Sequence, residues 1–137
     1  SQIFKLKSFK IGCVRLLDDS VNNKTWSKFE SWLTENAKEL KKLKIVGIGG
    51  NINKIFKISA TKHSKPLAKK SFLKTLKKIE SMSVTERLTV LKLNPDRADV
   101  IVPAGKIYYF ILKTLKVKDI YVPKIGLADG MVNELIK

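Results

Sequence analysis

Apolar residues recur along this chain at two spacings, one typical of strands and one typical of helices. In residues 3–17 apolar and basic residues alternate, and the phase of the alternation changes near Lys7. This pattern predicts two short strands, residues 3–6 and 9–16, with Gly12 at a bend or bulge. The chain therefore begins with strands that need a sheet around them.

Spacings of three and four residues then predict a series of helices. The first covers residues 26–43, with Thr25 or Asn23 as its N-cap. A second runs from Pro66, placed in its first turn, to near Met82. Ser83 and Glu86 match a capping box, which predicts a further helical piece toward residue 91.

Another helix is predicted over residues 98–115, where Pro103 should kink or start it and Gly105 indicates close backbone packing. Residues 119–122 are typical of a short strand, residues 126–130 of a turn, and residues 131–136 of a last helical segment. Strands and helices mixed in this order predict an α/β fold.

A glycine turn joins an apolar run at residues 45–46 to a predicted helix at residues 52–58. Its glycines are Gly47, Gly49 and Gly50, followed by Asn51. Glycines let backbone N–H groups approach a ligand, and the partial positive charge at the start of a helix favours phosphate. A tight connection without a ligand gives the same pattern, so both interpretations stay open here.

The net charge of the chain indicates the class of partner that it binds. The 137 residues contain 28 Lys and Arg against 12 Asp and Glu, a formal net charge of +16, and 44% are apolar, which suits one domain with a core. The excess predicts an anionic partner, a phosphate chain or a nucleic acid, while a solvated surface is the alternative. Lysine supplies most of this excess of positive charge. Its ammonium group attracts phosphates as a point charge and is less suited to bidentate recognition.

The side chains that carry most chemistry are sparse. Cys13 is the one cysteine, which excludes an internal disulfide and fits a small buried residue, and His63 lies in a polar loop. No acids pair in sequence as a metal or acid/base site would require, so donors for phosphate are present without an obvious base. No signal peptide or membrane-length apolar run is found, which makes a cytoplasmic protein without a membrane partner the expectation.

Four stretches in register resemble the exopolyphosphatase and guanosine pentaphosphate phosphohydrolase (Ppx/GppA) family of bacteria. They are residues 8–16, the glycine turn at residues 47–50, residues 94–105, and residues 126–131. The resemblance spans essentially the whole chain, and it rests on the order and spacing of motifs that are individually weak.

The resemblance implies a ribonuclease-H-like lobe of the actin, Hsp70 and sugar kinase superfamily, a mixed sheet flanked by helices. Residues 1–137 would form the second, C-terminal lobe of a longer chain, with the first strand of its sheet missing. In the family, the first lobe carries the catalytic glutamate, and a glycine-rich phosphate loop lies just before the stretch that matches residues 8–16. Neither is found in this sequence. The resemblance therefore implies half of an active site, inactive when isolated.

Residues match the family motifs position by position. Those implied to bind phosphate or substrate are Gly47, Gly49, Gly50, Asn51, Arg15 and Arg97. Those implied to belong to structural motifs are Asp99, Pro103, Gly105, Gly126, Asp129 and Gly130. Two positions depart from the pattern: Asn51 replaces the usual threonine or serine, and Ala128 replaces an arginine. No catalytic or metal-binding residue is matched.

The function implied by the resemblance is release of terminal phosphate from polyphosphate or guanosine pentaphosphate, with magnesium as the cofactor. The implied partners are that substrate and the missing N-terminal lobe, and a homodimer would use this lobe. Two alternatives stay open: a basic nucleic-acid-binding module, and an inactive family member that acts as a sensor or scaffold.

Overall fold

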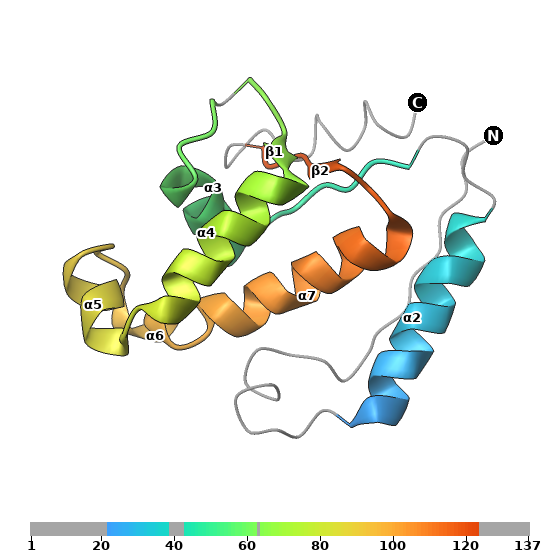
Figure 1. Ribbon diagram of the computed structural model, residues 1–137, viewed down its shortest axis with the longest axis horizontal. Helices are drawn as coiled ribbons and strands as arrows, with labels where there is room; N and C mark the ends of the chain where they lie inside the picture. The colour runs from blue at the N-terminus through green and yellow to red at the C-terminus, as the bar shows by residue number, and fades with distance from the viewer. Residues whose placement is uncertain (1–21, 39–42, 63, 124–137) are drawn as a thin grey trace.

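A computed structural model describes residues 22–38, 43–62 and 64–123, which form a helix-rich α/β arrangement (Figure 1). The strands predicted in residues 3–16, Cys13, His63, and the turn and helix predicted in residues 126–136 lie outside the described residues. Within these ranges, no helix is both long enough and apolar enough to cross a bilayer.

Helix α2, Asn23–Ala37, confirms the first predicted helix over most of its length. Its N-cap is Asn22, whose side chain accepts a hydrogen bond from the backbone N–H of Thr25 at 2.8 Å, so the prediction of Thr25 or Asn23 as cap was wrong. Leu43 lies outside the helix, which corrects the predicted C-terminal end. Trp26 and Phe29 of α2 pack against Phe110, with ring centroids 4.7 and 5.5 Å from it.

The apolar run before the glycine turn does not form a full strand. It pairs with the rest of the fold through a single parallel bridge, between Val46 and Tyr121. The N–H of Gly47 donates to the Tyr121 carbonyl, and the N–H of Tyr121 donates to the Ile45 carbonyl, both at 2.8 Å. Helix α3, Gly50–Ile58, follows the turn as predicted and begins two residues before the predicted start at Ile52.

Two short strands, β1 (Leu67–Ala68) and β2 (Asp119–Ile120), pair antiparallel, with Leu67 opposite Ile120. Helix α4 is Lys69–Ser81. The prediction of a helix from Pro66 was therefore wrong at its start. Leu67 is apolar at the right spacing for a helix, but it is fully buried in the strand pair with β2, which holds this segment extended.

In the described part of the chain, three helices follow α4: α5 (Val84–Thr89), α6 (Pro95–Ala98) and α7 (Ile101–Leu115). The predicted capping box at Ser83 and Glu86 is present, although α5 ends earlier than residue 91. Pro103 is the third residue of α7, where a missing N–H costs nothing, so it lies in the first turn of the helix and not at a kink.

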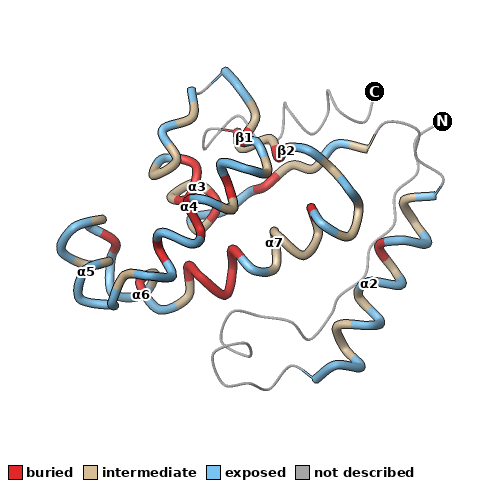
Figure 2. Tube along the Cα trace, in the orientation of Figure 1, coloured by how far each residue is buried: buried red, intermediate tan, exposed pale blue. Residues whose placement is uncertain are grey.

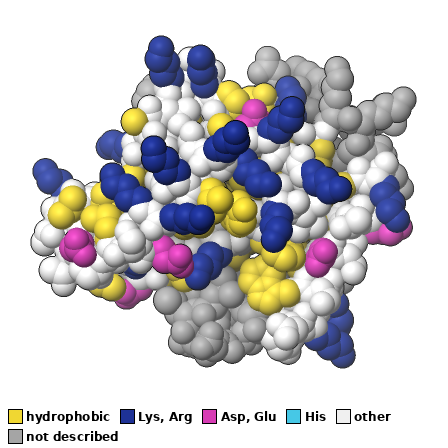
Figure 3. Space-filling view, viewed as in Figure 1, with side chains coloured by type: hydrophobic (Ala, Val, Ile, Leu, Met, Phe, Trp, Pro, Cys, Tyr) yellow, Lys and Arg dark blue, Asp and Glu magenta, His cyan; other side chains and the backbone are white. Residues whose placement is uncertain are grey.

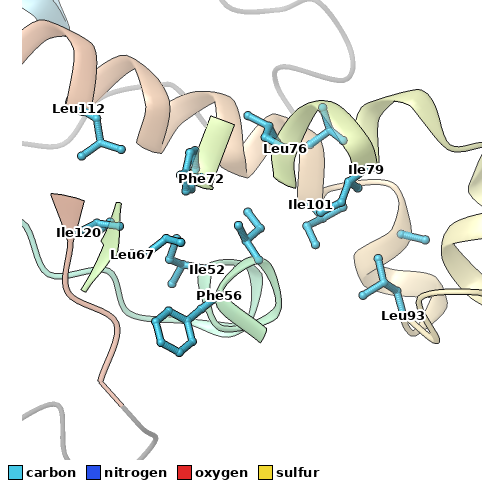
Figure 4. Packing of buried hydrophobic residues seen from close by; sticks show 13 residues of the cluster. Ile52, Phe56, Leu67, Phe72, Leu76, Ile79, Leu93, Ile101, Leu112 and Ile120 are labelled. Carbon is cyan, nitrogen blue, oxygen red and sulfur yellow. The ribbon is translucent and has the colours of Figure 1, made fainter. Parts of the chain in front are cut away.

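Buried side chains gather where α3, α4 and α7 meet the strand pair, whereas α2 and α5 are mostly exposed or half-buried (Figure 2). Each large side chain that is fully buried stabilises the fold by roughly 1.5–3 kcal/mol. Figure 4 shows these side chains pointing toward one another. The buried cluster consists of Ile52, Ile55, Phe56, Leu67, Phe72, Leu76, Ile79, Leu93, Ala98, Ile101, Val102, Leu112 and Ile120.

Two residues fix how the long helices meet. Gly105 of α7 is buried, and a Cβ built there would collide with the Leu76 side chain of α4, so glycine permits the close packing predicted from the sequence. Arg87 donates hydrogen bonds to the carbonyls of Ile79 and Ala98, each at 3.0 Å. It thereby ties the end of α4 to α6, at the end of the molecule where α7 begins.

Candidate functional site

The glycine turn lies between the bridge at Val46 and the start of α3. Gly49 has φ 124° and ψ 169°, a backbone conformation that is essentially restricted to glycine. A Cβ built on Gly49 would meet no atom within 4 Å, and both Gly49 and Gly50 are exposed. The turn therefore presents open backbone to solvent or to a ligand.

The start of α3 has no side-chain cap and no acidic residue in its first turn. The N–H of Asn53 donates to the Gly49 carbonyl at 3.1 Å, which begins the helix. The N–H groups before it lack an intrahelical acceptor, as at any helix start, and they carry partial positive charge. This end of α3 is therefore suited to receive an anion such as phosphate.

The side chain of Arg97 extends from α6 to the first turn of α3. Its Nη1 donates a hydrogen bond to Oδ1 of Asn51 at 2.9 Å, across 46 positions of sequence. The guanidinium group fills the space that a Cβ on Gly50 would occupy. The backbone N–H of Arg97 also donates to Oδ1 of Asn94 at 3.0 Å, which anchors the residue at the start of α6. A full positive charge is thus held against the first turn of α3.

A pocket of about 360 Å³ adjoins the turn. One wall consists of side chains from α7, and the Tyr108 hydroxyl donates to the Ile48 carbonyl at 3.3 Å, which links that wall to the turn. The turn and the start of α3 contribute backbone, Asn51 and two isoleucines, and α7 contributes apolar side chains together with the Tyr108 ring. The residues that line the pocket are Ile48, Gly49, Gly50, Asn51, Ile52, Ala104, Ile107, Tyr108 and Ile111.

The structure brings together four of the residues that the sequence predicted to bind phosphate: Gly49, Gly50, Asn51 and Arg97. Gly47 lies apart from them. It is buried, and a Cβ there would lie 2.9 Å from side-chain atoms of Ile120 and Ile52. Position 47 thus lies in the packing between α3 and β2, behind the exposed turn.

The other predicted residues are distributed more widely. Asp99 is exposed at the C-cap of α6, whereas Pro103 and Gly105 are buried in α7. Four more lie outside the described residues, so their predicted roles stay predictions: Arg15, Gly126, Asp129 and Gly130.

Tyr108 is a residue of the pocket that the sequence analysis missed. The neighbouring Tyr109 lies on another side of α7, and the ammonium group of Lys69 is 5.8 Å from the centroid of its ring. Tyr108 belongs to a second apolar row at positions 104, 107, 108 and 111, all of which line the pocket. This row has helical spacing and was therefore detectable in the sequence.

Carboxylates in the described part of the chain do not gather into a metal site. No group of three or more His, Cys, Asp and Glu side chains in these ranges could hold a metal ion. Asp96 and Asp99, which flank Arg97 in sequence, are both exposed. The described residues therefore do not fit a magnesium ion by themselves, and the predicted cofactor stays a prediction. The groups assembled at the turn are hydrogen-bond donors and one cation, which suit an anion.

Comparison with known proteins gives a family. The model of the Ppx/GppA phosphatase family matches residues 1–137. The crystal structure of the Aquifex aeolicus Ppx/GppA family member has 21% sequence identity and a TM-score of 0.64, and the match covers 96% of this chain and 49% of that one. The type II variant of the same phosphatase gives 20% identity, a TM-score of 0.64 and the same coverage.

A third structure, of the Aquifex aeolicus PPX-GPPA enzyme, has 20% identity and a TM-score of 0.53, and the match covers 92% of this chain and 44% of that chain. This chain therefore spans about half the length of the solved structures it matches. At these identities the likeness shows a shared fold. No curated protein sequence matches the chain.

Proposed function

This chain belongs to the Ppx/GppA phosphatase family, and on that premise we propose that it acts as one lobe of a phosphohydrolase. The substrate is inorganic polyphosphate or guanosine pentaphosphate, from which terminal phosphate is released. The lobe has the ribonuclease-H-like architecture of the actin superfamily. It supplies a phosphate-binding wall of the cleft, and an N-terminal lobe supplies the catalytic carboxylate.

The observation that carries the proposal is the position of Arg97 against the uncapped start of α3. Phosphate oxygens accept hydrogen bonds from the first-turn N–H groups and from the guanidinium group together. These donors neutralise charge on the phosphate chain and hold it in one orientation, which is the larger part of what a protein contributes to phosphoryl transfer. Asn51 holds the guanidinium group in place.

Magnesium belongs to the proposal as the cofactor of the whole enzyme. By analogy with the family its ligands come mainly from the other lobe; the described residues contain no cluster of ligands for it. A cytoplasmic location and a homodimer that uses this lobe complete the proposed picture. By itself the lobe binds phosphate chains and hydrolyses nothing.

A nucleic-acid-binding role has less support. Proteins that bind single strands without sequence preference stack bases on accessible aromatic side chains. Every Trp, Tyr and Phe in the described ranges is buried or half-buried, and Trp26 packs against Phe110. The lysines would attract RNA, but no aromatic side chain of the described residues is fully exposed to stack on its bases.

The test is binding of inorganic triphosphate, polyphosphate and guanosine triphosphate to the chain, followed by amide NMR shifts and calorimetry. We expect the amides of residues 49–52 to shift and Arg97→Gln to weaken binding at this site about tenfold, since a hydrogen bond to a charged group contributes about 1.5–3 kcal/mol. Lys28→Gln, which removes one exposed charge from α2, is the matched control and should change little. Unshifted amides at the turn would refute the proposal.

The inactive alternative requires a separate assay on the complete enzyme. If Arg97→Gln lowers phosphate release in proportion to its loss of binding, the lobe serves catalysis. If the complete protein binds phosphate chains through this turn and releases no phosphate with magnesium present, the chain belongs to a sensor or scaffold.

A further inference from the structure

The side chain of Arg87 lies where the ends of α4 and α6 meet. It belongs to α5, which lies beside α6 (Figure 1). Its Nε donates to the Ile79 carbonyl of α4 and its Nη1 to the Ala98 carbonyl of α6, each at 3.0 Å. A longer contact of 3.5 Å joins Nη2 to the Glu80 carbonyl. One guanidinium group thus donates to the C-terminal ends of two helices, where carbonyls lack intrahelical partners and carry partial negative charge.

Arg87 also brackets the short segment that carries Arg97. Its backbone carbonyl accepts from the N–H of Leu93 at 3.0 Å, before α6, and its side chain donates to the Ala98 carbonyl at the end of α6. Leu93 and Ala98 are both buried, so these two anchors lie in the interior. Helix α6 has four residues and is too short to be stable through its own hydrogen bonds. Its position therefore depends on what holds it from outside.

The position of α6 matters because Arg97 has one geometry in which it reaches the glycine turn. Its Nη1 donates to Oδ1 of Asn51 at 2.9 Å, and its guanidinium group fills the space beside Gly50. Hydrogen bonds of this kind span donor–acceptor distances of only about 2.7–3.2 Å. A displacement of α6 by about 1 Å would therefore break the contact. Because Ala98 follows Arg97 directly, the bond that holds the Ala98 carbonyl also restrains Arg97.

We propose that Arg87 is a positioning residue for the anion site. By holding the end of α6, it sets where Arg97 places its guanidinium group against the first turn of α3. This inference rests on the proposed function, and it adds a residue that acts on the phosphate site without touching the ligand. Arg87 is not among the residues that line the pocket at the turn, so its effect on binding passes through Arg97.

Charge is the first alternative explanation that a test has to separate from position. Figure 3 shows many Lys and Arg side chains and few Asp and Glu side chains on the face viewed there. No carboxylate of the described ranges forms an ion pair with Arg87, so its charge attracts anions whatever its hydrogen bonds do. Arg87→Lys keeps this charge and loses the planar fork of donors, whereas Arg87→Met loses both.

Titration with inorganic triphosphate, followed by the amide shifts of residues 49–52, compares these variants with the parent. We expect Arg87→Met to weaken binding at the turn about fivefold and Arg87→Lys about threefold, each less than the loss expected for Arg97→Gln. If Arg87→Lys binds as tightly as the parent, charge at a distance is sufficient and the proposal is overturned.

The double variant Arg87→Met/Arg97→Gln shows whether Arg87 acts through Arg97. We expect it to bind no more weakly than Arg97→Gln alone, because an arginine that is absent cannot be misplaced. Losses that multiply, to about fiftyfold, would overturn the proposal. If Arg97→Gln itself leaves binding unchanged, the proposed function fails and this inference fails with it. If Arg97→Gln weakens binding and Arg87→Met does not, this inference alone fails.

A general loss of stability is the second alternative, and Ser83→Ala is its matched control. Ser83 caps the same helix, and its replacement leaves the donors of the Arg87 side chain in place. We expect both Arg87→Met and Ser83→Ala to lower the Tm, and only Arg87→Met to weaken triphosphate binding. Equal losses of binding would overturn the proposal.

The Nε–H signal of Arg97 gives a second readout, in a proton–nitrogen correlation spectrum of the chain without ligand. We expect this signal to move in Arg87→Met and to stay in place in Ser83→Ala. A signal that stays in place in both variants would overturn the proposal, because Arg97 would then keep its surroundings without Arg87. If Arg87→Met does not fold, Arg87→Lys takes its place in each of these comparisons.

Discussion

Helix α5 begins with its own cap, whereas helix α3 begins with a bare glycine turn. At α5 the side chain of Ser83 accepts from the N–H of Glu86 at 3.1 Å, and the carboxylate of Glu86 accepts from the N–H of Ser83 at 2.9 Å. At α3 the N-cap is Gly49, no side chain caps the helix, and the cation Arg97 lies against the first turn. The capping box gives acceptors to backbone N–H groups at the start of α5, whereas the N–H groups at the start of α3 are left for a ligand.

The difference separates a structural helix start from one that is suited to a ligand. An acid near the first turn compensates the partial positive charge there, while an arginine in the same place increases the attraction for an anion. The fold tolerates the uncapped start because Ile52 and Ile55 of α3 are fully buried. Packing of these side chains thus stabilises α3 in place of a capping side chain.

The same substitution at the two N-caps tests this comparison, and the larger effect is expected at α3. Gly49→Ala leaves the space around the turn open but forces alanine into a glycine conformation. We expect a loss of about 1–3 kcal/mol in the free energy of unfolding. Urea denaturation measures it. A variant as stable as the parent would show that the turn relaxes to another conformation without cost.

Gly50→Ala should affect binding more than stability. The new Cβ would displace the guanidinium group of Arg97, the mobile end of a long side chain, and break its hydrogen bond to Asn51. Loss of that bond is offset by the better helix propensity of alanine, about 1 kcal/mol. We expect inorganic triphosphate to bind about tenfold more weakly at the turn, the factor expected for Arg97→Gln.

The double variant Gly50→Ala/Arg97→Gln is the control for this explanation. If the glycine acts by giving Arg97 its position, the second substitution adds nothing to the first. Additive losses, about a hundredfold in total, would mean that Gly50 contacts the anion independently of the arginine.

Ser83→Ala is the counterpart at the capped helix. It removes the acceptor for the Glu86 N–H, and we expect α5 and the protein to lose about 1 kcal/mol in the free energy of unfolding. Binding of triphosphate at the glycine turn should be unchanged, because α5 contributes no residue to the pocket. A loss of binding with Ser83→Ala would mean that the two helix starts are coupled, which the comparison denies.

The sequence predicted the capped helix more completely than the uncapped one. A capping box depends on residues three positions apart, so Ser83 and Glu86 could be identified without any tertiary information. The contact of Arg97 with Asn51 joins residues 46 positions apart, and only the family resemblance placed them in one site. Tyr108 was missed because two apolar rows compete on α7.

Errors at the element boundaries have the same origin. Pro66 and Leu67 fit the first turn of a helix by local rules, but pairing with Ile120 makes the segment a strand. Asn22 rather than Asn23 or Thr25 caps α2, a difference of one or three positions that spacing alone does not resolve. Local patterns therefore predicted which elements exist, and long-range pairing decided where they begin.

The smallest expected effect concerns the charge of Glu86. Hydrogen bonds from the backbone N–H and the side chain of Ser83 lower the pKa of Glu86 below its ordinary value of 4.5. A group whose pKa is lower in the folded state stabilises the fold above its unfolded pKa, and that contribution is lost as the pH falls through the folded value. Glu86 is therefore expected to stabilise α5 at pH 7 and to do so less and less as the pH falls below 4.5.

Glu86→Gln isolates this charge, because glutamine can still accept the hydrogen bond from the N–H of Ser83 and complete a capping box. We expect the Tm of Glu86→Gln to lie slightly below that of the parent at pH 7 and the difference to shrink toward pH 3. Glu86→Ala, which removes the acceptor altogether, should remain less stable than the parent at both values. If the deficit of Glu86→Gln were the same at pH 3 as at pH 7, geometry and not charge would distinguish the start of α5 from that of α3.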